Sequence, residues 1–193
     1  MMNYAEYLAY ADQALRSVKP QEVQGMIDLL WHAYEAGSTV FVIGNGGSAA
    51  TASHLAQDLA KGTRRTLAQK RRVRALALTD SAPFLTAYGN DDGYEFVFEQ
   101  QLRNHARPGD VLIAISGSGN SPNILCAVKW AKRNGLTTLG ITGFDGGKLR
   151  RLAQHKLHVP LNDMCTAESI HSVLLHYVVL ALAGRIHGNV AWH

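Results

Sequence analysis

The sequence contains little cysteine and no long apolar run. Its two cysteines, Cys126 and Cys165, lack metal-motif spacing and are too few for a disulfide framework, which excludes disulfide-rich secreted domains. No 18 consecutive residues are apolar, so we expect no membrane-spanning helix. The N-terminus lacks a basic segment followed by an apolar one, so we expect no signal peptide. These absences favour a cytoplasmic globular protein.

Acidic residues are fewer than basic ones, 15 against 19, which gives a formal net charge of +4. The densest basic stretch, KGTRRTLAQKRRVR at 61–74, is either an anion-binding or nucleic-acid-binding patch or a solvated loop. No aromatic residues are interleaved with the basic ones, and no nucleic-acid-binding motif accompanies them. The sequence therefore favours the loop, and we expect neither a nucleic-acid partner nor a membrane partner.

Short apolar segments alternate with helical patterns along the whole chain. Strands are predicted at 38–44, 73–79, 110–116, 136–142 and 155–161, and helices at 3–18, 20–36, 48–62, 81–90, 94–106, 121–135, 146–154 and about 166–187. This alternation predicts an α/β fold with a parallel sheet covered on both faces. Because no linker or composition break is present, we expect one domain, 1–193, with an N-terminal helical extension, 1–36.

Two of the predicted strands end in turns of similar plan. TVFVIGNGGSAATA and DVLIAISGSGNSPNIL each read as an apolar strand, a Gly/Ser turn and the start of a helix. Glycine lets backbone N–H groups approach a ligand, a helix N-terminus favours an anion, and serine adds hydroxyl donors. The turns therefore predict a phosphate cradle at the carboxyl edge of the sheet. The alternative is that Ser121 only caps its helix and the glycines only turn the chain.

Two nucleotide-binding motifs bear on the kind of phosphate ligand: one fits this sequence poorly and the other is absent. The segment GNGGSA at 44–49 fits the loose dinucleotide-binding pattern, but the acid that follows the next strand, Asp80, lies well beyond the expected spacing. The Walker pattern for nucleoside triphosphates is absent. A serine-lined cradle without lysine suits a small phosphomonoester that is held for positioning.

Five segments taken together resemble the sugar isomerase (SIS) domain family, and within it the phosphoheptose isomerases. They are GNGGSAATASH, LTAYGNDDGYE, GDVLIAISGSGNSPNIL, GITGFDGGKL and ESIHSVLLH. The resemblance implies a flavodoxin-like three-layer αβα sandwich with a five-stranded parallel sheet. It also implies a homotetramer with active sites between subunits. The implied activity is that of a metal-dependent aldose–ketose isomerase, an intramolecular oxidoreductase that interconverts sedoheptulose 7-phosphate and glycero-manno-heptose 7-phosphate.

The resemblance also assigns roles to residues of this chain. Substrate-binding positions are matched by Asn45, Gly46, Gly47, Ser48, Asp91, Ser116, Gly117, Ser118 and Ser121. Metal-site positions are matched by His54, Asp58, Glu168 and His176. The chain departs from the family in four places. It has Asp58 where Glu is usual and Glu168 where Gln is usual. It has Gly117 where the serine turn of the family usually has Thr, and Cys165 where an acidic residue is usual.

The predicted ligand set is chemically consistent with a divalent metal. His54 and Asp58 are four residues apart on one helix and share a face. Glu168 and His176 are eight apart, roughly 80° around a helix, and can still converge. Zinc is the commonest metal for such ligands, and nickel and manganese also suit them. His171 is a competing ligand or a neighbour that orients one.

Aldose–ketose isomerisation needs a base for the carbon-bound proton and stabilisation of the enediolate. Asp58 or Glu168 is predicted as the base, with His176 as its acid partner. The alternative function is a non-catalytic phosphosugar-binding protein of the same family, including the kind that assists a replication initiator. Retention of both histidines and of acids at 58 and 168 favours the enzyme.

Overall fold

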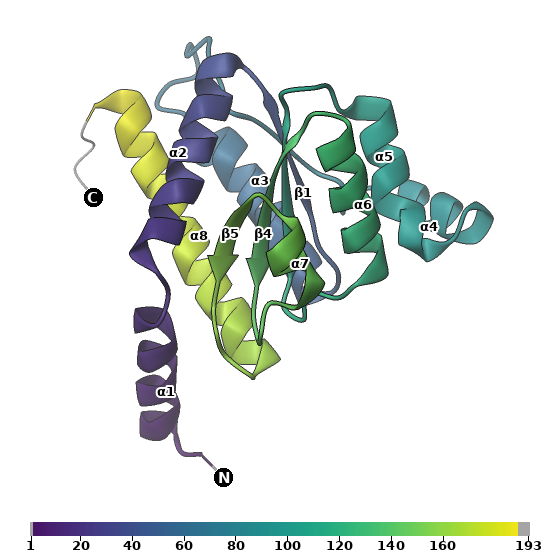
Figure 1. Cartoon of the computed structure of the whole chain (residues 1–193). Coiled ribbons are helices and arrows are strands. Elements are labelled where there is room, and N and C mark those ends of the chain that lie inside the picture. The colour runs from purple at the N-terminus through teal and green to yellow at the C-terminus, as the bar shows by residue number, and fades with distance from the viewer. Residues whose placement is uncertain (1, 189–193) are drawn as a thin grey trace.

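A five-stranded, fully parallel sheet forms the centre of the molecule (Figure 1). The computed structural model describes residues 2–188. The strands are β1 (Thr39–Ile43), β2 (Arg74–Ala77), β3 (Val111–Ser116), β4 (Thr137–Thr142) and β5 (His155–His158), in the order β2-β1-β3-β4-β5. All five predicted strands are present, each within its predicted range, and the predicted α/β fold is confirmed.

Helices cover both faces of this sheet. One layer consists of α2 (Pro20–Ala36), α3 (Gly47–Gln57) and α8 (Met164–His187), and the other of α5 (Val97–His105), α6 (Pro122–Arg133) and α7 (Gly147–Leu152). Successive strand residues point to opposite faces, so Val40 and Val42 join the first hydrophobic cluster while Phe41 and Ile43 join the second. Two short elements, α4 (Ala82–Asp91) and η2 (Tyr94–Phe96), pack beside α5.

The sheet order creates a switch point between β1 and β3. From β1 the chain crosses to β2 on one side, and it then returns to β3 on the other side of β1. The connections that follow β1 and β3 therefore lead to opposite faces and leave a crevice at the carboxyl edge, which is where open parallel sheets bind ligands. The side chain of Asn45, after β1, hydrogen-bonds to that of Asn123, after β3, so the two Gly/Ser turns do lie side by side as predicted.

The first helix, α1 (Tyr4–Arg16), extends away from the body of the molecule (Figure 1). It begins with a capping box, in which Asn3 and Glu6 bond to each other's backbone N–H groups. Ala14 is its one buried residue, whereas Tyr4 is 76% and Leu8 50% exposed. Packing within a single chain therefore leaves much of the apolar surface of α1 uncovered.

The predicted helix at 48–62 is two elements. An α-helix, α3, ends at Gln57 and is followed by a π-helical turn, η1 (Asp58–Gly62). The basic stretch after it runs as a loop to β2, where Arg71 donates to the carbonyl of Glu35 and Arg72 to that of Gln69. These bonds fit the predicted solvated loop.

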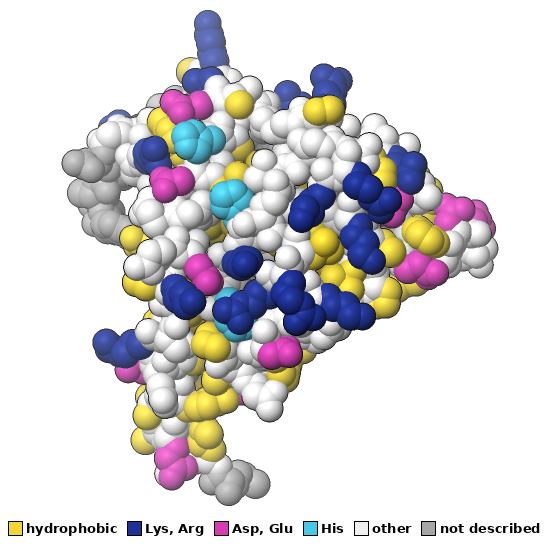
Figure 2. All heavy atoms as spheres, in the orientation of Figure 1, with side chains coloured by type: hydrophobic (Ala, Val, Ile, Leu, Met, Phe, Trp, Pro, Cys, Tyr) yellow, Lys and Arg dark blue, Asp and Glu magenta, His cyan; other side chains and the backbone are white. Residues whose placement is uncertain are grey.

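Other basic side chains gather over α6, α7 and β5 on the face seen in Figure 2. They include Lys132 and Arg133 in the last turn of α6, and Arg150 and Arg151 in the last turn of α7. Cations at helix C-termini complement the partial negative charge of the final carbonyls. Helix stability therefore accounts for these four basic side chains.

By length and composition, α8 is the one helix within residues 2–188 that could cross a membrane. This is weak evidence for a membrane span, because the core helix of a soluble protein passes the same test. In this fold α8 packs against α2 and α3, and its surface includes Glu168 and His176, whose positions are described below.

Candidate functional site

The two Gly/Ser turns and the start of α8 enclose a pocket of about 280 Å³, here called the cradle. Its lining consists of Asn45, Gly46, Gly47, Ser48, Ile115, Ser116, Gly117, Ser118, Ser121, Met164 and Glu168. Eight of the nine predicted substrate-binding residues are in this lining. The N-termini of α3 and α6 both open at the cradle, so unpaired N–H groups and partial positive charge favour an anion there.

The serine hydroxyls of the second turn face one another in the cradle. Ser116 Oγ and Ser121 Oγ are 3.4 Å apart, and Ser116 Oγ accepts from the Gly119 N–H at 3.2 Å. Ser121 occupies the N-cap position of α6 but makes no capping hydrogen bond with its side chain. Simple helix capping therefore does not explain Ser121, and its hydroxyl can serve a ligand.

Glycine is required at position 119 of this turn. Gly119 has φ +65°, and a Cβ there would overlap the carbonyl oxygen of Gly146 and lie 2.7 Å from its carbonyl carbon. The close approach lets the Leu149 N–H donate to the Gly119 carbonyl at 2.9 Å. The start of α7 thereby holds the Ser/Gly turn in place through contacts with Gly119.

A network of amide side chains joins the two turns. Asn45 and Asn123 donate to each other at 2.9 and 2.8 Å, and the Asn45 carbonyl oxygen also accepts from Tyr94 Oη at 3.1 Å. Asn123 is 2% exposed and additionally accepts from the Ile124 N–H. Sequence reasoning missed Asn123 and Tyr94. The signal for Asn123 was weak: it lies in the segment GDVLIAISGSGNSPNIL, two residues after Ser121.

A second site lies where α3, η1 and α8 meet. His54 Nε2 is 3.4 Å and His176 Nε2 is 3.7 Å from Asp58 Oδ2, and the two Nε2 atoms are 3.5 Å apart. All three ligand atoms lie within 4.8 Å of one another, and Asp58 is the least exposed of the three residues. A tetrahedral zinc ion with bonds of about 2.1 Å holds its ligands about 3.4 Å apart, so this donor set fits a divalent metal.

Glu168, the fourth predicted ligand, lies in the cradle and is not in this metal group. Its Oε1 is 3.3 Å from Ser48 Oγ, and its carboxylate would collide with any Cβ at Gly47. The reason is helical geometry: eight residues separate Glu168 from His176, about 12 Å along the axis of α8. Within one chain the predicted four-residue set is therefore a group of three.

His171, the competing ligand, is also outside the metal group. It is fully buried, and its Nε2–H donates to the Thr142 carbonyl at 3.2 Å. Burial lowers the pKa of His171 to about 4. Among the described residues, His171 Nδ1 is the one buried side-chain polar atom without a partner.

Asp91 does not line the cradle. It ends α4, is exposed, and accepts a hydrogen bond from Asn90 at 2.7 Å. Asp91 is therefore the one predicted substrate-binding residue that a single chain does not place in the cradle, and its substrate contact stays a prediction.

Comparison with known proteins places this chain in a family. A family model described as SIS domain matches residues 4–143. Phosphoheptose isomerase of Citrifermentans bemidjiense is 36% identical over 165 residues, 86% of this chain and 84% of the relative. The Maridesulfovibrio salexigens protein of that name is 41% identical over 140 residues, 72% and 67% of the two chains.

Solved structures extend this likeness to the fold. The structure of phosphoheptose isomerase GmhA from Neisseria gonorrhoeae aligns with a TM-score of 0.84 at 31% identity, over 92% of this chain and 95% of that one. A phosphoheptose isomerase from Francisella tularensis aligns with a TM-score of 0.84 at 26% identity. The chain therefore belongs to the SIS domain family and is homologous to the phosphoheptose isomerases.

Proposed function

We propose that this chain is a phosphoheptose isomerase that interconverts sedoheptulose 7-phosphate and glycero-manno-heptose 7-phosphate. One observation carries the proposal: α3 and α8 each contribute to both a serine-lined anion cradle and a His/Asp/His group. A binding module needs the cradle alone. Conversion of an aldose to a ketose also requires groups that move protons and stabilise an enediolate.

The cradle holds the phosphate and positions the sugar. Hydroxyls of Ser116, Ser118 and Ser121 donate to the phosphate oxygens, together with N–H groups at the start of α6. Asn45 and Ser48, which follow β1, also line the cradle and bind the sugar hydroxyls. The hydrogen bonds from Asn123 and Tyr94 keep the Asn45 amide in one orientation.

We assign the carbon-bound proton to Asp58, through Oδ1, and the oxygen-bound proton to His176, through Nδ1; Asp58 Oδ2 and the Nε2 atoms of both histidines, which face one another, are left for a metal. Asp58 is 22% exposed in its side chain, so it is accessible to substrate while flanked by two imidazoles. Glu168 is the alternative base, since its carboxylate lies inside the cradle. The reaction is an internal redox exchange between C1 and C2, so no external electron acceptor is needed.

His54, Asp58 and His176 would hold a divalent metal, for which we propose zinc. When bound, such an ion supplies Lewis acidity that stabilises charge on the sugar oxygens. The three ligands come from α3, η1 and α8, which pack against one another and keep the separation of the ligands fixed without any loop.

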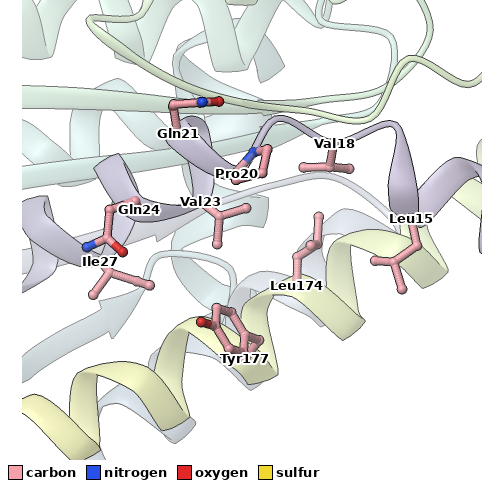
Figure 3. A pocket seen from close by; sticks show the side chains of 9 residues that line it. All are labelled: Leu15, Val18, Pro20, Gln21, Val23, Gln24, Ile27, Leu174 and Tyr177. Carbon is pink, nitrogen blue, oxygen red and sulfur yellow. The ribbon is translucent and has the colours of Figure 1, made fainter.

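The assembly is proposed to be a homotetramer with the N-terminal helices at its centre. An apolar groove of about 470 Å³ lies between the α1–α2 connection and α8, and Figure 3 shows Leu15, Val23, Leu174 and Tyr177 along it. It contains none of the predicted site residues. Together with the uncovered apolar surface of α1, this groove supports burial against a second copy. The single domain, 1–193, and the cytoplasmic location are further parts of the proposal.

Turnover of sedoheptulose 7-phosphate by the zinc-loaded protein, followed by NMR, tests the proposal. Asp58→Asn is expected to abolish turnover and lower the bound metal while leaving phosphosugar binding intact, because the amide lacks charge and basicity. Glu168→Gln restores the residue usual in the family and is expected to be milder. Glu99→Gln, on the opposite helical layer, is the matched control. Phosphosugar binding without turnover in the parent would instead identify a binding module.

A further inference from the structure

The first turns of α8 lie directly over the two glycine turns of the cradle. Met164 and Glu168 are four residues apart and therefore project from the same face of α8. A Cβ at Gly117 would overlap Met164 Sδ and lie 3.0 Å from its Cε, and a Cβ at Gly47 would lie 2.8 Å from Glu168 Cδ. Each glycine thus faces one particular side chain of α8.

At Gly117 the contact involves Met164 alone. Apart from the glycine and its two chain neighbours, these two Met164 atoms are the only described atoms within 4 Å of the Cβ position. Gly117 is not among the glycines with positive φ, so its backbone accepts a side chain without strain. The Met164 thioether, from α8, therefore occupies the space that a side chain at position 117 would otherwise fill.

Met164 is also part of the ligand pocket. It lines the cradle and is 38% exposed, so its thioether can contact a bound molecule. The thioether is flexible, apolar and at best a weak acceptor, so it packs against C–H groups and cannot donate to a hydroxyl. It stands over the turn whose serines bind the phosphate, where the carbons next to the phosphate must lie.

We infer that Met164, in the space left by Gly117, is a specificity-determining wall of the cradle. It selects unbranched sugar phosphates and rejects those with a bulky substituent, such as an acetamido group, near the phosphate end. This inference rests on the proposed function, because it assumes that the cradle binds the substrate. It assigns the selection to two residues on different elements that act as a pair.

Binding calorimetry with glucose 1-phosphate and N-acetylglucosamine 1-phosphate tests the wall, because the two differ by an acetamido group on the carbon next to the one that carries the phosphate. The parent is expected to prefer glucose 1-phosphate by about tenfold or more, and Met164→Ala to reduce that ratio about tenfold, since a few apolar atoms in a pocket discriminate by this amount. Val173→Ala is the control: Val173 is on the same helix, is 50% exposed and does not line the cradle. An unchanged ratio in Met164→Ala would overturn the inference.

The pairing is tested by a double-mutant cycle. Gly117→Ala is expected to change the ratio about fivefold while Met164 is present and less than about twofold in the Met164→Ala background. Equal effects in both backgrounds would overturn the pairing. Because the readout is binding, a parent that binds selectively and shows the coupling but never isomerises supports the inference and refutes the proposed function. If the parent isomerises but Met164→Ala leaves the binding ratio unchanged, the result supports the proposed function and refutes the inference.

Discussion

Replacing His171 by glutamine should make the free energy of unfolding less sensitive to acid. His171 is fully buried in the fold, where its Nε2–H donates to the Thr142 carbonyl and its Nδ1 has no partner, and unfolding exposes it to water. Protonation of Nδ1 would bury a cation that nothing neutralises. His158, which faces the same threonine through its Nδ1 at 2.9 Å, adds repulsion. Glutamine keeps a donor for Thr142 and does not titrate.

The magnitude follows from proton linkage. Burial, the largest cause, lowers the pKa of His171 from 6.5 to about 4, so the unfolded chain binds the proton more tightly than the folded one. The stability that depends on neutral His171 is thus fully present above pH 6.5 and is lost as the pH falls towards 4. The whole interval corresponds to about 3 kcal/mol, of which about 2 kcal/mol is lost between pH 7 and pH 5.

Urea unfolding at pH 7 and pH 5, at one protein concentration, measures this loss. Desolvation also lowers the pKa of His158, so other groups contribute to the loss in the parent, and the informative quantity is the difference between parent and variant. The variant should lose about 2 kcal/mol less than the parent over this interval. Equal losses in the two proteins would refute the reasoning, because they would mean that His171 has the same proton affinity in both states.

Three other outcomes follow from the site and the surface. Ser118→Ala or Ser121→Ala should weaken phosphosugar binding by about 1–3 kcal/mol and leave the unphosphorylated sugar unaffected in calorimetry; equal losses for both ligands would exclude the cradle. Asn123→Ala leaves the Ile124 N–H and the Asn45 Nδ2 group without partners, so urea unfolding should show a loss of about 1–3 kcal/mol and binding should weaken, whereas unchanged values would remove Asn123 from the network. Light scattering at micromolar concentration should give a tetramer, and Leu8→Glu should shift it to smaller species; a monomeric parent contradicts the proposed assembly.

The strands and the cradle were predictable because their signals are local. Apolar runs such as residues 111–115 end at a Ser/Gly turn, and a helix pattern follows each turn, so the sequence itself indicates where the sheet edge and the helix N-terminus lie. A parallel sheet then requires turns that follow neighbouring strands to meet at one edge. His54 and Asp58 were equally predictable, because four residues on a helix define one face.

The remaining features depend on packing between elements, which spacing does not reveal. The π-helical turn that begins at Asp58 has no sequence signature, although such turns are frequent at functional sites. The contact of Met164 with Gly117 joins residues 47 positions apart, and the amide pair of Asn45 and Asn123 joins residues 78 apart. The spacing of Glu168 and His176 allows both to bind one metal ion, whereas α8 directs their side chains to separate pockets.

The geometry of α8 also bears on how the two pockets work together. Glu168 borders the cradle and His176 completes the metal group, about 12 Å apart along one straight helix. On α3, Ser48 and His54 are separated by about 9 Å in the same direction. These spans are comparable with the full length of an extended seven-carbon sugar phosphate, so a ligand held by its phosphate in the cradle reaches the His/Asp/His group of the same chain only when fully stretched. A site shared between subunits relaxes that demand, because the metal group of one copy can face the cradle of another. The separation of the pockets within one chain and the uncovered apolar surface of α1 therefore both support the proposed homotetramer, in which a second copy would complete the site.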